Sequence, residues 1–484
     1  MTDLTRVLDK ADPRDIAHKV VKEDFTSDDG ISTLQYYQEE FYFHDSSAYR
    51  RMPKTEVRAA VWELLREAKV WVKDPASQQM VLAPFKPRSR NVDEVSDTLK
   101  AECELVSVNG PPIWLPGRPQ NMIGIEAKEL LPVANGLLHV PTGSLCPPTP
   151  ALFLESASSV AFDENAPPPK QWKKFLNQVL DPSAQRTLQT IFGYCLVRDT
   201  SFQKIFLLVG PKRSGKGTIA YVLQQMLGME SIASMSLSNF SQQFGLQKLI
   251  GKPLCIVPDA RFGRKNDAAL LTERMLSISG EDLVNVPRKY REDWVGRLPT
   301  RFLILTNELP HLQDTSGALA DRFVILKTKQ SFLGKEDLQL RARLLLDLPS
   351  ILNWAVAGYQ RLQREKRFAE PVSSAAEKEM MRAVMSPITG FIDERCELGT
   401  GLQVSKKELY AVYLQWCDGN GVRAEASHVF GRDLVAACPS VSTTRPAGVD
   451  RNRHYTGIAL MGRGAANVER AQDLLARAKG KAAS

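Results

Sequence analysis

Short, continuous apolar runs alternate with stretches of helical periodicity through the second half of the chain. The runs lie at residues 205–209, 254–258, 302–306 and 323–326. Runs of this length, separated by helical stretches, are typical of parallel strands that helices bury on both faces. We therefore expect an α/β fold with a parallel sheet in this part of the chain.

The sequence also predicts helices in three regions outside these strands. We expect helices over residues 54–70, 170–200 and 335–365, where apolar residues recur at helical spacing or the strand pattern stops. In the second of these, Trp172 and Phe175 lie on one stripe. The segment around Phe41 reads as short aromatic structure.

Proline-rich joints near residues 110, 147 and 167 break the chain. The predicted organisation is an N-terminal accessory region over 1–150, which is α/β or mostly helical, a helical collar-like segment over 151–200, the α/β domain over 201–370, a small module over 378–460, and a basic flexible tail over 461–484.

Composition narrows the class of protein. A chain of 484 residues with 43% hydrophobic residues has room for about three domains and enough apolar surface for real cores. No apolar stretch reaches the ~18 residues of a membrane span, and no apolar leader follows Met1, so we expect a soluble, cytoplasmic protein without a membrane partner. The seven cysteines are scattered without a C-x-x-C pair, which argues against a zinc ribbon or a disulfide framework.

The charge balance permits a polyanionic partner. Sixty-three basic residues against 55 acidic residues give a net charge of +8. An ordinary basic surface explains a surplus of this size equally well, so charge alone does not identify nucleic acid as the partner.

A glycine-rich loop follows the first apolar run directly. It consists of Gly210, Pro211, Lys212, Arg213, Ser214, Gly215, Lys216, Gly217 and Thr218. This is G-x-x-x-x-G-K between a strand and a helix, where backbone N–H groups curl around phosphates and the lysine reaches the terminal ones. The loop predicts ATP binding, although GKGT also occurs in small-molecule phosphotransferases.

Polar residues at the ends of the next strands complete a candidate hydrolysis site. Asp259 is expected to hold Mg²⁺, with an N-capping role as the alternative, and Asn307 to orient the attacking water. The residue after Lys216 is Gly217 rather than the usual Ser or Thr, so Thr218 or a water molecule would complete the metal shell.

Cations between and after these strands suggest two further roles. Arg288, Lys289, Tyr290 and Arg291 form a dense basic group with one aromatic ring, which suits a hairpin that grips phosphates; a solvated basic turn is the alternative. Arg322 directly precedes the last strand and is a candidate for an arginine finger offered to a neighbouring subunit.

In this order the motifs closely resemble the superfamily-three helicase domain of phage and plasmid primase-helicases, a branch of the AAA+ P-loop ATPases. The resemblance rests on the loop, Asp259, the SGED and RKY segments, TNELP and ALADRF, and covers roughly residues 30–460. It implies a ring, commonly a hexamer, with ATP sites between subunits, Arg322 acting in trans and Lys289 in the channel. Ala260 stands where relatives often carry a second acid, which leaves Glu308 and Glu281 as candidates for the general base.

Residues 378–460 resemble the winged-helix module of such proteins. Arg432 would lie on its recognition helix, and the basic wing would contain Arg445, Arg451 and Arg453. A winged helix that docks protein rather than duplex DNA is the alternative. Clustered carboxylates of a primase are not evident in residues 1–150, where the acidic pair at 28–29 reads as a turn.

These observations predict an ATP- and Mg²⁺-dependent replicative DNA helicase in the cytoplasm of a bacterial host. It would act on single-stranded and on forked or duplex DNA as a homo-oligomer, with a primase or other replication proteins as possible partners. Two alternatives stay open: an origin-binding initiator that does not unwind processively, and a small-molecule kinase.

Overall fold

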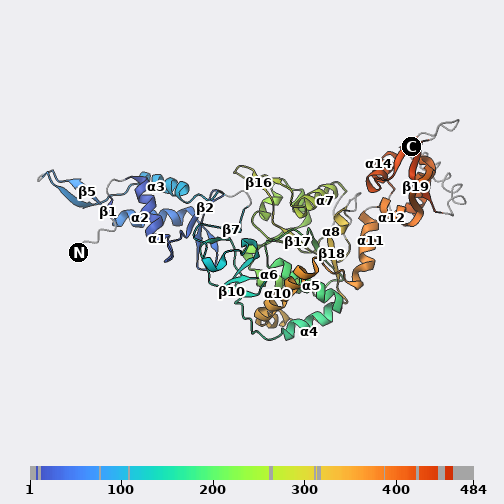
Figure 1. The fold of residues 1–484 in the computed structure, drawn as a ribbon, viewed down its shortest axis with the longest axis horizontal. Helices are drawn as coiled ribbons and strands as arrows, with labels where there is room; N and C mark the ends of the chain where they lie inside the picture. The colour runs from blue at the N-terminus through green and yellow to red at the C-terminus, as the bar shows by residue number, and fades with distance from the viewer. Residues whose placement is uncertain are drawn as a thin grey trace.

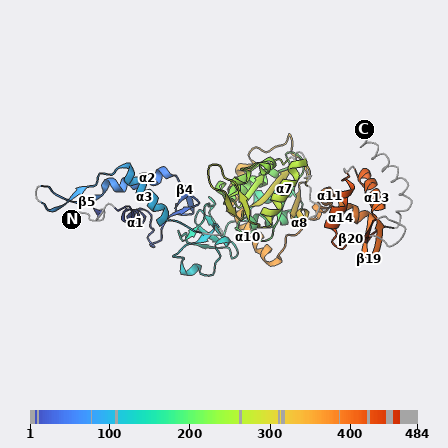
Figure 2. The same ribbon diagram turned by 90° about the horizontal axis from the view of Figure 1, so that it is seen from above.

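The computed structural model describes residues 7–8, 12–75, 78–106, 110–260, 265–309, 312, 318–385, 387–420, 424–444 and 453–461. The chain forms an elongated molecule in which three bodies follow one another along the long axis (Figure 1). The N-terminal region lies at one end, the α/β body in the middle and the C-terminal module at the other end, and the view from above shows the same order (Figure 2).

Three helices and two small sheets build the N-terminal region. The helices are α1 (Pro13–Asp24), α2 (Lys54–Glu67) and α3 (Ser89–Glu102); one sheet contains β1 (Val7–Leu8), β5 (Lys69–Lys73) and β6 (Met80–Pro84), and the other contains β2 (Leu34–Tyr37), β3 (Glu40–His44) and β4 (Tyr49–Met52). The helices share one apolar core that includes Ile16, Val61 and Leu99.

The helix expected over 54–70 ends earlier than predicted. It stops at Glu67, and the next residues form strand β5, which pairs antiparallel with β6. The cause is the run Val70, Trp71 and Val72, whose β-branched and aromatic side chains favour a pleated strand over a helix.

A segment of short strands connects this region to the central body. It contains β7 (Ile113–Trp114), β8 (Leu130–Val133), β9 (Gly136–His139), β10 (Ser144–Cys146) and β11 (Leu152–Phe153). Leu131, Val133 and Leu138 pack in the same apolar cluster as the helices of the central body. The segment is therefore fastened to that body by hydrophobic burial.

The central sheet has five strands, all parallel. They are β12 (Ile205–Val209), β13 (Ile232–Ser234), β14 (Leu254–Val257), β17 (Arg301–Thr306) and β18 (Phe323–Lys327), in the order β13-β14-β17-β12-β18. Phe206 and Leu208 belong to one core cluster, and Ile205 and Leu207 to the other. Because side chains alternate along a strand, this division shows that both faces of the sheet are covered. The mixed α/β fold and the parallel sheet are confirmed.

Helices lie on each face. One face carries α4 (Lys170–Val179), α5 (Pro182–Cys195), α6 (Lys216–Leu227), α9 (Leu340–Leu346) and α10 (Leu348–Glu365), and the other carries α7 (Lys265–Ser279) and α8 (Ala318–Arg322). Of the helix expected over 335–365, the first residues are not helical and α9 begins at Leu340. The expected helix over 170–200 is two helices, separated where Asp181 caps α5 and Pro182 begins it.

Helices α5 and α10 approach closely through two glycines. A Cβ at Gly193 would lie 2.3 Å from the carbonyl oxygen of Ala355, and one at Gly358 would lie 2.1 Å from that of Gln189. These contacts would be impossible with any larger residue, so the two glycines set the spacing of the helix pair under the sheet.

A hairpin and several short 3₁₀ helices lie between the elements described so far. A two-stranded hairpin contains β15 (Val284–Val286) and β16 (Trp294–Gly296), and the 3₁₀ helices are η2 (Gln120–Met122), η3 (Ala127–Glu129), η4 (Met229–Ser231), η5 (Leu237–Ser241), η6 (Gly245–Leu249) and η7 (Val372–Ser374).

The C-terminal module is a helical core with a small antiparallel sheet. It follows the linking helix α11 (Ala375–Met385) and contains α12 (Pro387–Arg395), β19 (Cys396–Ser405), α13 (Lys406–Gly419), α14 (Ser427–Ala437), β20 (Ser442–Thr444) and β21 (His454–Leu460). Phe391, Tyr413, Trp416 and Phe430 form its aromatic core. Within the described ranges, no helix combines the length and apolar character needed to cross a membrane.

Candidate functional site

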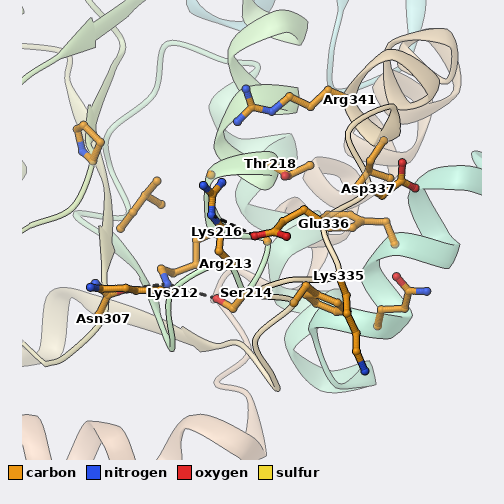
Figure 3. Close-up of a pocket in the computed structure, with 18 of the residues that line it drawn as sticks. Lys212, Arg213, Ser214, Lys216, Thr218, Asn307, Lys335, Glu336, Asp337 and Arg341 are labelled. Carbon is orange, nitrogen blue, oxygen red and sulfur yellow. Dashed lines mark hydrogen bonds and ion pairs between the residues drawn. The ribbon is translucent and has the colours of Figure 1, made fainter.

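A cavity of about 1090 Å³ opens at the carboxyl edge of the central sheet. Its walls are the loop after β12, the start of α6, the residues that follow β14 and β17, part of α4, and the segment 332–341 (Figure 3). Parallel strands place all their carboxyl ends at one edge, which is where open α/β sheets bind ligands. The position of the cavity follows from the sheet topology.

Glycines at both ends of the loop permit its tight path. Gly210 has φ +151°, and a Cβ there would lie 1.9 Å from Thr328 Oγ1. Gly215 has φ +93°, and a Cβ there would lie 2.8 Å from Val179 Cγ1. Ser214 is buried between them and accepts a hydrogen bond from Thr328 Oγ1 at 2.8 Å. The loop is thus clamped against β18 and α4.

The Lys216 side chain is folded back into this loop. Its Nζ donates to the carbonyl oxygens of Gly210 at 2.6 Å and Pro211 at 2.7 Å, and to Asn307 Oδ1 at 3.2 Å. Burial lowers the pKa of the Lys216 ammonium, while the nearby Asp259 carboxylate opposes that shift. A buried ammonium held by neutral oxygens is well prepared to exchange them for an anion.

Asp259 and Asn307 meet beside this lysine. Asn307 Nδ2 donates to Asp259 Oδ1 at 3.5 Å, and both residues line the cavity together with Thr218. The structure therefore brings together three of the four residues that the sequence suggested for catalysis: Lys216, Asp259 and Asn307. A Cβ at Gly217 would meet no heavy atom of the described residues within 4 Å. The described surroundings would therefore have room for the Cβ of the Ser or Thr that usually follows the loop lysine.

The segment 332–341 closes one side of the cavity, a role that its sequence pattern did not predict. Arg213 Nε lies 3.6 Å from Glu336 Oε1, and Phe332 N donates to the carbonyl oxygen of Arg213. Arg341 lines the cavity (Figure 3). Its guanidinium stands 4.7 Å from the ring centroid of Tyr221 on α6. The cluster Lys335, Glu336 and Asp337 is the signal that could have drawn attention to this stretch.

Arg322 lies at the opposite edge of the sheet. It directly precedes Phe323, which pairs with Ile205 at the start of β12. Its Nη1 donates to Ser279 Oγ at 2.7 Å and to the carbonyl oxygen of Leu276. The structure therefore does not bring Arg322 to the cavity of its own chain.

The two candidates for a general base lie in different places. Glu281 accepts a hydrogen bond from Thr200 Oγ1, next to the amino end of β12 and away from the cavity. Glu308 is exposed and follows Asn307 directly in the chain. Of the two, Glu308 is the nearer to the cavity.

The basic group expected on a hairpin lies between strands β15 and β16. Tyr290 is 92% exposed, and Lys289 Nζ lies 5.0 Å from its ring centroid. Arg288 Nε donates to the carbonyl oxygen of Glu292 at 2.7 Å. Arg291 instead forms ion pairs with Glu39 and Glu40 of the N-terminal region.

The basic residues of the C-terminal module are only partly described. Arg432 lies on α14, is largely exposed, and its Nε donates to Asp433 Oδ1 at 2.9 Å. Arg453 directly precedes β21 and is exposed. Arg445 and Arg451 lie outside the described residues.

Three family models match successive parts of the chain. Residues 38–181 match the family described as D5 N terminal like, residues 208–322 match a family of unknown function (DUF5906), and residues 384–446 match the Poxvirus D5 protein-like family. Lys216, Asp259 and Asn307 fall within the second of these matches, whereas the cavity walls formed by α4 and by the segment 332–341 lie outside it.

The solved structures that resemble this chain have low sequence identity to it. An apo structure of the NrS-1 C-terminal region superposes with a TM-score of 0.51 at 10% identity, covering 93% of this chain and 100% of that one. An A-form apo structure of the same region has a TM-score of 0.48 at the same identity and coverage.

The two D5-type matches lie before and after the match that contains the glycine loop. The first of the two structures extends the common fold over almost the whole chain. Separate parts of the chain are therefore similar to two D5-type families, and its fold is similar to that of the NrS-1 C-terminal region.

Proposed function

We propose that the protein is an ATP-driven replicative DNA helicase of a phage, plasmid or integrated element. The observation that carries the proposal is the convergence of Lys216, Asp259 and Asn307 at the carboxyl edge of the sheet, next to a glycine loop that opens a helix. A cation, a carboxylate and an amide in these places suit phosphate binding, metal binding and orientation of a water molecule.

The cavity fits ATP with Mg²⁺ in both space and chemistry. The loop glycines permit the tight backbone path beside the cavity, and α6 directs its positive end at the cavity. Thr218 and Asp259 offer the oxygen ligands that Mg²⁺ prefers, which it usually supplements with phosphate oxygens and water. When bound, the nucleotide would supply the bond that is hydrolysed; Lys216 would hold its phosphates and Asn307 would orient the water.

The position of Arg322 supports an oligomer. Because this arginine lies at the far edge of its own sheet, it can reach a γ-phosphate only in the cavity of another subunit. We infer an assembly of AAA+ type, such as a hexameric ring, in which each subunit completes its neighbour's site.

Two regions would contact DNA. The exposed Tyr290 and Lys289 at the hairpin tip offer a stacking surface and a cation for a single strand. The described part of the C-terminal module has three helices and a three-stranded sheet, which supports the proposal of a winged helix, and Arg432 is exposed on α14, which suits phosphates of duplex DNA.

The test is ATP hydrolysis with and without single-stranded DNA at one salt concentration. We expect DNA to stimulate the wild type and Lys216→Ala to abolish hydrolysis. Lys329→Ala is the matched control, because this lysine follows Thr328 beside the loop but its Nζ donates to the carbonyl oxygen of Asn177 on α4. Hydrolysis that is indifferent to DNA would count against a helicase and favour an initiator or a kinase.

A further inference from the structure

A buried carboxylate connects the N-terminal region to the hairpin that is proposed to contact DNA. Glu40, at the start of β3, has a side chain that is only 7% exposed. Arg51 of β4 binds it through two nitrogens, with Nε to Oε2 at 3.0 Å and Nη2 to Oε1 at 2.8 Å. Arg291 of the hairpin binds the same carboxylate through its Nη2.

Both arginines affect the pKa of the Glu40 carboxyl. Burial alone would raise the pKa of this carboxyl, but the hydrogen bonds from Arg291 and Arg51 outweigh it and hold the pKa below its ordinary value. The group is therefore an ionised carboxylate whose stability depends on charged partners, and removing a partner of such a group is costly.

Arg291 is placed differently from the other cations of its hairpin. Arg288 bonds within the hairpin and Lys289 stands over the exposed ring of Tyr290. Arg291 contacts Glu40, which lies 251 residues away in the sequence, and its Nε stands 3.7 Å from Glu39 Oε2. Its side chain remains 34% exposed, so a polyanion in solvent can reach it.

The hairpin itself has a fixed base and an exposed tip. Val286 is fully buried in the core of the central body, and Trp294 packs against the same cluster. Between them the tip carries the highly exposed Tyr290. Beyond this base, the tip is held by a hydrogen bond from Lys289 N to Gln247 Oε1 at 3.4 Å and by the contact of Arg291 with Glu40.

We propose that Glu40 latches the β15–β16 hairpin in the DNA-free protein, and that phosphates of single-stranded DNA compete with Glu40 for Arg291. The proposal rests on the DNA-binding role given to the hairpin above. A guanidinium binds carboxylate and phosphate with the same forked geometry, so exchange between the two needs no new chemistry. With this latch, the mobility of the hairpin depends on whether single-stranded DNA is bound.

The first test needs no DNA. Backbone amide hydrogen exchange is measured on the full chain over residues 284–296. We expect faster exchange in Glu40→Gln and in Arg291→Gln, and wild-type exchange in Asp45→Asn. Asp45 is a matched control because it lies in the same sheet region and stands 3.8 Å from Arg50. Unchanged exchange in both latch variants would overturn the latch.

Arg291→Gln also guards against a folding defect, because it leaves the buried Glu40 paired with Arg51. A result seen in Glu40→Gln but not in Arg291→Gln would therefore indicate a damaged N-terminal region and would overturn the latch.

The second test is binding of a fluorescent oligothymidine at several salt concentrations. Glu40→Gln should bind several-fold more tightly than the wild type, and this gain should vanish when Arg291→Gln is added. A gain that persists without Arg291 would reflect overall charge and would overturn the competition. Failure of the wild type to bind any strand would instead refute the proposed DNA function, while the exchange data would still report on the latch.

Discussion

The position of Arg322 leads to a prediction about how subunits cooperate. Phe323, the next residue, is in register with Ile205, whereas the glycine loop begins at Gly210, five residues further along β12. At about 3.3 Å per residue, Arg322 is roughly 17 Å from the loop of its own chain, beyond the reach of its side chain. If Arg322 acts on ATP hydrolysis as proposed above, it acts in another subunit.

The expected magnitude is large. Arginines that stabilise the charge of a transferring phosphate contribute roughly 10³–10⁵ in rate, so Arg322→Ala should reduce ATP hydrolysis by about 10³-fold or more. Lys216→Ala should do the same from the other side of the interface. Neither variant alone has a complete site.

Mixing the two variants should restore part of the activity. In a random equimolar ring, half of the subunits keep Lys216 and half keep Arg322, so about a quarter of the interfaces contain both, and roughly a quarter of wild-type hydrolysis should return. The control mixes Lys216→Ala with the double variant, which rebuilds no interface. A mixture no more active than its components would refute the action of Arg322 in trans.

Three further predictions concern packing, DNA and metal. Gly358→Ala should lower the free energy of unfolding by about 1–3 kcal/mol or more, because its Cβ would overlap a carbonyl of α5; Gly419→Ala, which faces open space, is the control in chemical denaturation. Tyr290→Ala should weaken single-strand binding, measured by anisotropy, by roughly 1–3 kcal/mol. Thr218→Val should raise the Mg²⁺ concentration needed for half-maximal hydrolysis; an unchanged requirement would remove Thr218 from the metal site.

The sequence predicted the features that depend on local pattern. The runs at β12, β14, β17 and β18 are apolar because both sheet faces are buried, so their positions could be read directly. The meeting of Asp259 with Asn307 then followed from parallel topology, which gathers strand ends at one edge. Periodicity over 54–70 predicted α2 correctly but placed its end three residues too late, because Val70, Trp71 and Val72 belong to strand β5.

Contacts between distant segments could not be predicted in the same way. After β18 the chain passes back over the glycine loop, and this brings the segment with Arg341 to the cavity. The hydrophobic pattern of the sequence does not indicate that path. The pairing of Glu40 with Arg291 likewise depends on how two separately folded regions sit together. In the sequence, neither Glu40 nor Arg291 differs from an ordinary charged residue in a polar segment, so their pairing could not be predicted.

Strand displacement on a forked duplex tests the central claim most directly. With ATP and Mg²⁺, the wild type should separate the strands, and Lys216→Ala should bind the fork without separating it. Hydrolysis that DNA stimulates but that displaces no strand would contradict the helicase and favour an initiator that assembles on DNA without unwinding it.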